Sequence, residues 1–304
     1  MKSCRNISIV FIGWVYFVPV LRVSAQCDDW RAGPLVDIPG VDGTVYVATT
    51  WDPDGAGPLP PQLVIGGDFI TAGGTTVNRI ARWDGTAWQP FGSGMTLVSA
   101  GPPGVTGLTV LPASFGALAG QLVATGYFDS AGGTPAASIA RWDGAAWHAL
   151  ATSVAPRAGF SNSWVNVAMV PPPGSGPVSG HLIVGGHFSA IDGVTANCIA
   201  DWNGTSWTQM GGGMENAVYS LTMWDPDGAG PIPNHIVAGG RFSTAGGLTV
   251  NHVAQWTGSA WTSLYAGLGD GWYFQAVHCV ATIPTGNGPF AGQLVAGVDF
   301  TMSI

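Results

Sequence analysis

The sequence predicts an all-β protein built from repeated units of short strands, and three observations carry this prediction. The 304 residues include 47 Gly and 22 Pro but only one Lys and one Glu, so the commonest surface helix formers are nearly absent. Hydrophobic residues make up 46% of the chain, with 14 Trp and 12 Phe, which is enough to form a core and argues against disorder. A unit of about 58 residues recurs along the chain.

The repeated unit has a distinctive sequence. It begins as Leu63-Val-Ile-Gly-Gly-Asp-Phe69, continues through Ala72-Gly-Gly74 and ends as Ile80-Ala-Arg-Trp-Asp-Gly-Thr-Ala-Trp88. The same pattern returns at 122–147, 182–207 and 236–261, and a fifth copy begins at 294. The Phe that closes the first segment recurs at Phe69, Phe128, Phe188, Phe242 and Phe300.

Each unit predicts four strands. The first covers 63–69, the second covers 80–83 and leads into an Asp84-Gly85 turn, and the third starts at Trp88 and ends near Met95. The fourth recurs at 45–51, 105–111, 165–170, 218–224 and 277–283. Four strands in a repeat of this length are typical of a β-propeller blade. We therefore expect the paired Trp of strands two and three to fill the gaps between blades, and the Gly pair to allow a close approach or a bulge.

We expect a propeller of about five four-stranded blades. Trp30 and 45–51 supply a third and a fourth strand before the first full repeat, and 294–300 supplies a first strand after the last one. The last blade would then be shared between the two ends of the chain, without the strand that carries Ile-Ala-x-Trp-Asp-Gly. Because the pattern breaks at 301–304, we expect a truncated product of a longer gene, with an imperfect final blade as the alternative.

The N-terminus predicts export. Lys2 and Arg5 precede an apolar stretch at 7–21, and Val23-Ser24-Ala25 fits a signal-peptide cleavage site. We expect residues 1–25 to be a signal peptide and 26–304 to be one propeller domain, monomeric, in the periplasm, at the cell surface or outside the cell. The net charge of −8 and the lack of basic clusters argue against nucleic acid as a partner. No membrane insertion is expected after signal cleavage.

Cysteine usage is sparse. Three cysteines would remain after cleavage, so at most one internal disulfide can form, and the pairing among Cys27, Cys198 and Cys279 stays open. Their spacing does not match a zinc site.

The segment Leu63-Val-Ile-Gly-Gly, followed by Trp83-Asp-Gly and Trp88, resembles the kelch-type propeller repeat. The whole pattern is similar to secreted bacterial repeat proteins with units of the form GGxFxxAGGxxxxxIAxWDGxxW. The resemblance covers about residues 27–300 and implies a propeller fold, but no particular activity, because propellers host many functions. Some positions depart from the pattern: for example, Thr125 replaces a Gly of the pair, Asp192 replaces a Gly, and Thr257 replaces the turn Asp.

A ring of polar residues is the main candidate site. One set begins the predicted first strands, and the other precedes the repeated Phe. The first set is Gln62, Gln121, His181, His235 and Gln293, and the second is Asp68, Tyr127, His187, Arg241 and Asp299. If the first strands are innermost, these side chains converge on a central channel and could bind a ligand. Alternatively, they are solvated strand ends. His181 and His235 could contribute to a metal site, but two ligands alone do not make one.

Two acidic loops are a second candidate. Asp52 and Asp54, and likewise Asp225 and Asp227, stand two apart before a Gly, as in calcium loops. Asx-turn stabilisation is the alternative, because no third acidic ligand follows. We expect no cofactor other than this calcium.

These features favour an exported, noncatalytic propeller that binds or displays a protein or glycan ligand. An extracellular enzyme of the copper radical oxidase or glycosidase type is an alternative, since such enzymes occur on related propellers, although Glu215 is the only Glu and no carboxylate pair stands out. A purely structural surface repeat protein is a third interpretation. Near-equal repeats favour the two noncatalytic interpretations.

Overall fold

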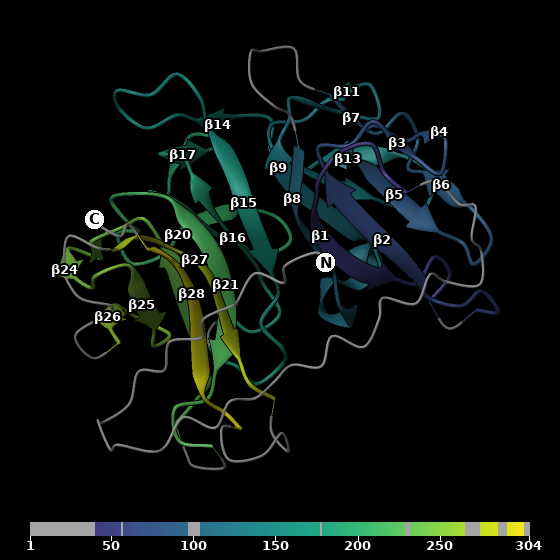
Figure 1. Ribbon diagram of the computed structural model, residues 1–304. Helices are drawn as coiled ribbons and strands as arrows, with labels where there is room; N and C mark the ends of the chain where they lie inside the picture. Colours follow the sequence, from purple (N-terminus) through teal and green to yellow (C-terminus); the bar gives the residue numbers. More distant parts are fainter. Residues whose placement is uncertain are drawn as a thin grey trace, which may run out of the picture.

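A computed structural model describes residues 40–55, 57–96, 104–176, 178–228, 232–264, 274–284 and 291–300 (Figure 1). The predicted signal peptide, Trp30, Cys27 and the last four residues lie outside these ranges. Within them, no helix is long and apolar enough to cross a membrane.

The protein is all-β, as predicted, and its main elements are four antiparallel sheets of four strands each. The first sheet has the order β1 (Val45–Trp51), β2 (Gln62–Gly67), β5 (Ile80–Trp83) and β6 (Trp88–Pro90). The second has β8 (Gly104–Val110), β9 (Leu122–Tyr127), β12 (Ile139–Trp142) and β13 (Trp147–Ala149). The third has β15 (Trp164–Met169), β16 (Leu182–His187), β19 (Ile199–Trp202) and β20 (Trp207–Gln209). The fourth has β21 (Val218–Trp224), β22 (His235–Gly240), β25 (Val253–Trp256) and β26 (Trp261–Ser263).

A two-stranded sheet follows the fourth one and consists of β27 (Phe274–Thr282) and β28 (Leu294–Phe300). The sheets follow one another in sequence order, from the purple and blue strands to the yellow pair (Figure 1). The strand predicted as fourth in each unit opens the next sheet. These five strands, which we call the edge strands, are β1, β8, β15, β21 and β27. Each edge strand packs beside the next, β1 against β8 and so on to β27.

This order corrects one premise of the sequence analysis. The strands at 63–69 and its copies were expected to be innermost, but β2, β9, β16 and β22 each lie second in their sheet. The edge strands instead take the position at which neighbouring sheets meet, since successive edge strands pack against one another.

The predicted third strand is wrong at its far end. β6 stops at Pro90, and Met95–Thr96 forms a separate strand, β7, that pairs with β10 (Ser130–Ala131) of the next unit. The Ala72-Gly-Gly74 segment turns between β3 (Thr71–Ala72) and β4 (Thr75–Thr76). Both glycines have positive φ, 57° and 80°, as a tight two-residue hairpin turn requires.

Similar short hairpins occur in the other units. They comprise β11 (Thr134–Pro135) with β10, β17 (Ala190–Ile191) with β18 (Val194–Thr195), and β23 (Thr244–Ala245) with β24 (Leu248–Thr249). β14 (Val154–Ala155) joins β17 as β7 joins β10, and Met214 bridges to Ala245, so these contacts link the first four units in succession. A 3₁₀ helix at Ala113–Leu118 connects β8 and β9.

Tryptophans join each sheet to the preceding one, as the sequence predicted. The indole Nε1 of Trp147 donates a hydrogen bond to the Phe91 carbonyl at 2.9 Å. Trp207 donates in the same way to Leu150, and Trp261 to Met210. All three indoles are buried, so each contributes both apolar area and a satisfied hydrogen bond between sheets.

The Gly pairs permit close packing between sheets. A Cβ on Gly66 would lie 2.6 Å from Val105 Cγ1 of the next edge strand, and Gly185 meets Val218 in the same way. In the second unit Thr125 replaces this Gly. The edge strand of its own sheet then carries Gly107 opposite Thr125, which leaves space for the threonine side chain.

Candidate functional site

Every edge strand contains a β-bulge opposite the Gly-pair position. In the first sheet the register shifts between Val45 and Val47, so one residue of β1 is left without a direct partner on β2. The same shift occurs in the other four edge strands. The residues at the shift, which we call the bulge residues, are Tyr46, Thr106, Asn166, Tyr219 and His278. Bulges change the direction of a side chain and are common beside functional sites.

Bulge side chains contact the next edge strand. Thr106 Oγ1 donates a hydrogen bond to the Val165 carbonyl at 3.2 Å, and Asn166 Nδ2 donates to the Val218 carbonyl at 2.9 Å. The Tyr219 ring lies parallel to the His278 ring, with centroids 5.4 Å apart. The bulge residues therefore form a continuous row across the edge strands.

A pocket of about 400 Å³ opens at this row. It is lined by Tyr46, Gly104, Thr106, Tyr127, Asn162, Trp164 and Asn166. Three of these residues are bulge residues, and the lining comes from the first three sheets. Three aromatic side chains with a few amide and hydroxyl groups are typical of a small-molecule site, and the volume falls within the usual range.

Trp164 is held by aromatic neighbours. Its ring stacks on His187 at 4.6 Å and meets Tyr127 nearly edge-on at 6.1 Å. The Phe160 ring in turn packs edge-on against the His187 ring, with centroids 4.5 Å apart. Burial lowers the pKa of His187, and the nearby positive charge of Arg157 lowers it further. His187 is therefore a neutral ring at pH 7 and supports Trp164 by stacking.

Tyr46 is held by Asp68. The Tyr46 hydroxyl donates to Asp68 Oδ2 at 2.7 Å, and the Thr44 backbone N–H donates to Oδ1 at 2.5 Å. The hydrogen bond from Tyr46 is the main reason that the pKa of Asp68 is lowered, and the same bond raises the pKa of Tyr46. Asp68 is thus ionised at neutral pH, and both of its oxygens accept hydrogen bonds from the chain itself.

The structure brings together part of the second predicted set. Tyr127 lines the pocket, Asp68 fixes Tyr46, and His187 supports Trp164. Arg241 is exposed, and its backbone N–H donates to the Ala217 carbonyl. The side chain of Asp299 lies outside the described part of the protein.

The first predicted set lies at the opposite end of the sheets, beside the turns that follow Trp83 and its copies, and four of its five members are paired. Gln62 accepts from Arg82 at 3.0 Å, and Gln121 accepts from Arg141 at 2.5 Å. His181 Nδ1 hydrogen-bonds Asp201 at 2.9 Å.

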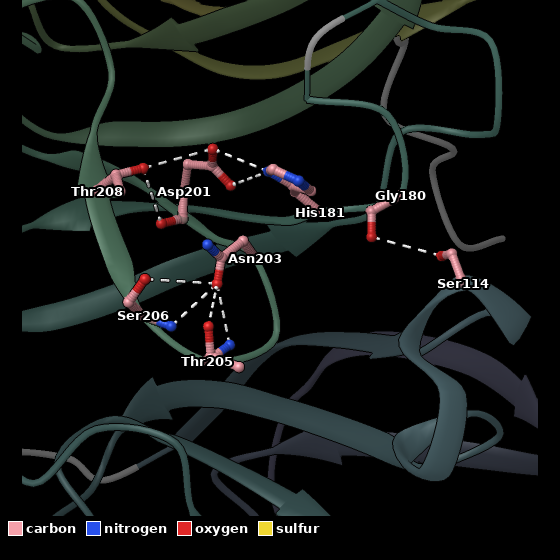
Figure 2. A network of polar contacts seen from close by, with 8 residues as sticks. All are labelled: Ser114, Gly180, His181, Asp201, Asn203, Thr205, Ser206 and Thr208. Carbon is pink, nitrogen blue, oxygen red and sulfur yellow. Dashed lines mark hydrogen bonds and ion pairs between the residues drawn. The ribbon is translucent and has the colours of Figure 1, made fainter.

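Each of these pairs joins a residue at or directly before the start of one strand to a residue twenty positions later on the neighbouring strand. Figure 2 shows the His181–Asp201 pair with Thr208 beside it, close to the turn in which the Asn203 side chain accepts from the backbone of Thr205 and Ser206. His235 pairs with Gln255 in the same manner, at 3.0 Å. Gln293 is exposed. Four of the five first-set side chains are therefore used within their own sheets.

The acidic loops have the geometry of Asx turns. Asp52 accepts from the Asp54 backbone N–H, and Asp54 accepts from the Leu59 backbone N–H. The Asp225 and Asp227 carboxylates have the same contacts, the latter with Ile232. Among the residues that the structure describes, no group of three or more His, Cys, Asp or Glu side chains is placed to hold a metal ion.

Both described cysteines are free thiols. Cys198 is buried, and burial raises the pKa of its thiol, although Arg157 hydrogen-bonds the sulfur at 3.2 Å. Cys279 is exposed. Cys27, the third cysteine among which the pairing was left open, lies outside the described ranges.

The sequence analysis did not identify the bulge residues or Trp164, although a signal was present. In each copy of the predicted fourth strand, one Val precedes the bulge residue, as in Val45-Tyr46 and Val218-Tyr219. An alignment of these five copies shows a polar or aromatic residue directly after a shared Val. The sequence favoured a site at the first strands because their His and Gln residues are more typical of binding sites.

Comparison with models of known protein families gave no match, and a search of curated proteins found no similar sequence. The function is therefore argued from the fold and the pocket.

Proposed function

We propose that this protein is an exported, noncatalytic β-propeller of about five blades, of the kelch type, that binds a ligand through the pocket at the bulge residues. The succession of similar four-stranded sheets, joined edge strand to edge strand, supports the propeller. In this proposal the strands β27 and β28 belong to the last blade, which is shared between the two ends of the chain and lacks one strand. The ligand is a glycan or a protein met outside the cell.

The pocket wall is the observation that carries the binding function. Tyr46, Tyr127 and Trp164 present aromatic surface, while Asn162, Asn166 and Thr106 add hydrogen-bonding groups. This combination gives apolar contact area together with orienting polar groups. The lining contains no carboxyl, imidazole or thiol side chain, the groups that most often act in acid–base and nucleophilic catalysis.

Thermal unfolding with a mixed ligand panel tests the proposal. The panel contains neutral oligosaccharides, peptides, quaternary ammonium compounds and copper. A ligand at about a hundred times its Kd adds about 2.7 kcal/mol to the free energy of unfolding, which shifts Tm visibly. We expect a shift with wild-type protein that is lost in Trp164→Ala but kept in Trp224→Ala. Trp224 is a matched control because it is also half-buried on an edge strand, at the opposite end.

Two results would contradict the proposal. One is a panel in which no compound shifts Tm in any variant. The other is turnover of a glycoside or an alcohol by the wild-type protein, which would favour the enzymatic alternatives. Export has its own test, in which the N-terminal sequence of protein recovered outside the cytoplasm is expected to begin at Gln26.

A further inference from the structure

We propose that the ligand of this pocket is a neutral saccharide whose sugar ring stacks in the space between Tyr46, Tyr127 and Trp164. The inference rests on the proposed function, because it specifies the chemical class of ligand for the same pocket. Three properties of the pocket support it: its aromatic surfaces, its remaining hydrogen-bonding capacity, and the absence of charge among its lining residues.

The aromatic surfaces match the apolar faces of a sugar ring. Tyr46 comes from the first sheet, Tyr127 from the second and Trp164 from the third, so aromatic rings from three sheets line one open pocket. A pyranose presents C–H groups on its faces and hydroxyl groups around its rim. Stacking on an aromatic ring removes apolar area of both partners from water and leaves the hydroxyls at the edge.

Two of the three aromatic rings are held by contacts within the chain itself. Trp164 is stacked on His187, and Tyr46 is tied through its hydroxyl to Asp68. Gly104 lies beside the Tyr46 ring, where a Cβ would be 3.1 Å from Tyr46 Cε2. A rigid wall reduces the entropy lost on binding, which matters for a small ligand.

The polar groups of the wall keep capacity for hydroxyl groups. Asn166 uses one N–H for the Val218 carbonyl, which leaves its other N–H and its carbonyl oxygen. Thr106 donates its proton to the Val165 carbonyl and Tyr46 donates to Asp68, so both hydroxyl oxygens remain acceptors. A sugar hydroxyl donates and accepts at once, and therefore complements this mixture.

The lining residues carry no charge. Asp68 stands behind Tyr46, and its two oxygens already accept hydrogen bonds from Tyr46 and Thr44. A neutral ligand loses less hydration on entry than an ion does, and an ion would find no charged partner in the wall. The main rival is a quaternary ammonium group, which aromatic cages bind through their π faces. The amide and hydroxyl groups favour the saccharide, because an alkylated ammonium cannot hydrogen-bond them.

The volume is consistent with this ligand. About 400 Å³ lies near the lower limit of small-molecule sites, roughly 300–1,000 Å³, and suits one or two sugar rings rather than a folded protein surface.

The test is a titration of the full chain with neutral disaccharides, in which isothermal calorimetry and tryptophan fluorescence measure binding. The disaccharides are cellobiose, mannobiose, galactobiose and chitobiose. We expect at least one to bind the wild type, with Kd raised tenfold or more in Trp164→Ala. Asn166→Ala and Asn162→Ala should weaken binding several-fold, and Asn162 is an exposed loop residue whose loss does not threaten folding. Tyr46→Ala should also weaken binding, and Tyr219→Ala, its matched control, should not. Both residues are bulge tyrosines, but only Tyr46 lines the pocket.

The outcomes separate this inference from the proposed function. If no disaccharide binds but tetramethylammonium or a peptide binds and is lost in Trp164→Ala, the saccharide inference is wrong and the binding function stands. If a disaccharide binds equally to wild type, Asn162→Ala and Trp164→Ala, the pocket assignment is wrong. If no probe of any class binds, both fail.

Discussion

The two ends of the same strands differ in how their polar side chains are used. At the turn end, beside the turns that follow Trp83 and its copies, four of the five first-set residues pair within their own sheets, as His181 does with Asp201. At the bulge end, side chains reach from one sheet to the next, as Asn166 does to Val218, and three of them line an open pocket. The same strands therefore use their polar side chains for pairing within a sheet at one end, and leave side chains with hydrogen-bonding capacity for a ligand at the other.

This difference indicates where to look for function in a repeat protein. Positions that perform the same task in every unit, such as the Trp that bonds the preceding sheet, contribute to stability. Positions with the same backbone but different chemistry, such as Tyr46, Thr106 and Asn166, are free to specify a ligand. Substitutions at the two kinds of position separate these two tasks.

Trp147→Ala should have the largest effect, because it opens the contact between the first and second sheets. We expect a loss of about 3–5 kcal/mol in the free energy of unfolding, from lost packing and from the unpaired Phe91 carbonyl. Trp147→Phe keeps most of the packing and should cost about 1–3 kcal/mol. Urea denaturation measures both, and a loss below about 1 kcal/mol for the alanine variant would show that this indole does not join the sheets.

Gly186→Ala tests whether the bulge end depends on the Gly pair. A Cβ at this position would clash with the backbone carbonyl of Trp164, so we expect a loss of about 2–3 kcal/mol. Saccharide binding should also weaken, because Trp164 would move. Gly40→Ala is the control, since a Cβ there meets nothing within 4 Å and should change stability by about 0.5 kcal/mol or less. Equal stability of the two variants would show that the close approach is unimportant.

His181→Ala tests the turn end. The Asp201 carboxylate is buried and would lose its main side-chain partner, which should cost about 1–2 kcal/mol. Ligand affinity should stay at the wild-type value, because His181 is far from the pocket lining. A variant with unchanged stability but weaker binding would reverse the assignment of the two ends.

His187→Phe addresses pH dependence at the bulge end. Burial keeps the pKa of His187 in the folded protein below its usual value of 6.5, so the unfolded chain takes up the proton first on acidification. The wild-type Tm should therefore be constant above about pH 6.5 and fall as the pH drops through that value. The Phe variant, which still stacks on Trp164, should lose this part of the pH dependence and change stability at pH 7 by about 1 kcal/mol or less. Melts at pH 5.5, 7 and 8 measure it, and identical pH profiles would contradict the burial argument.

Much of the architecture could be predicted from sequence because it repeats. The Trp83-Asp-Gly turn and the spacing of Phe69 and its copies gave the four-strand units and the contacts between sheets. The order of strands in a sheet could not be predicted from the repeat. A repeated sequence does not show whether Val45–Trp51 and its copies pair with the unit that precedes them or with the unit that follows them. The pocket was missed for a related reason. A bulge is a property of register between two strands, so the Val before Tyr46 and Asn166 marks their position only when the five copies of the strand are aligned.

If the bulge end binds the ligand and the turn end stabilises the fold, the indole N–H resonances of the two ends respond differently to the ligand. A ¹H–¹⁵N spectrum of the full chain, assigned with single Trp→Phe variants, is recorded with and without a bound disaccharide. We expect the Trp164 resonance to shift on ligand addition, while those of Trp147, Trp207 and Trp261, which are hydrogen-bonded between sheets, stay in place and exchange slowly with solvent. A Trp164 resonance that does not move, with shifts confined to tryptophans at the turn end, would contradict the account.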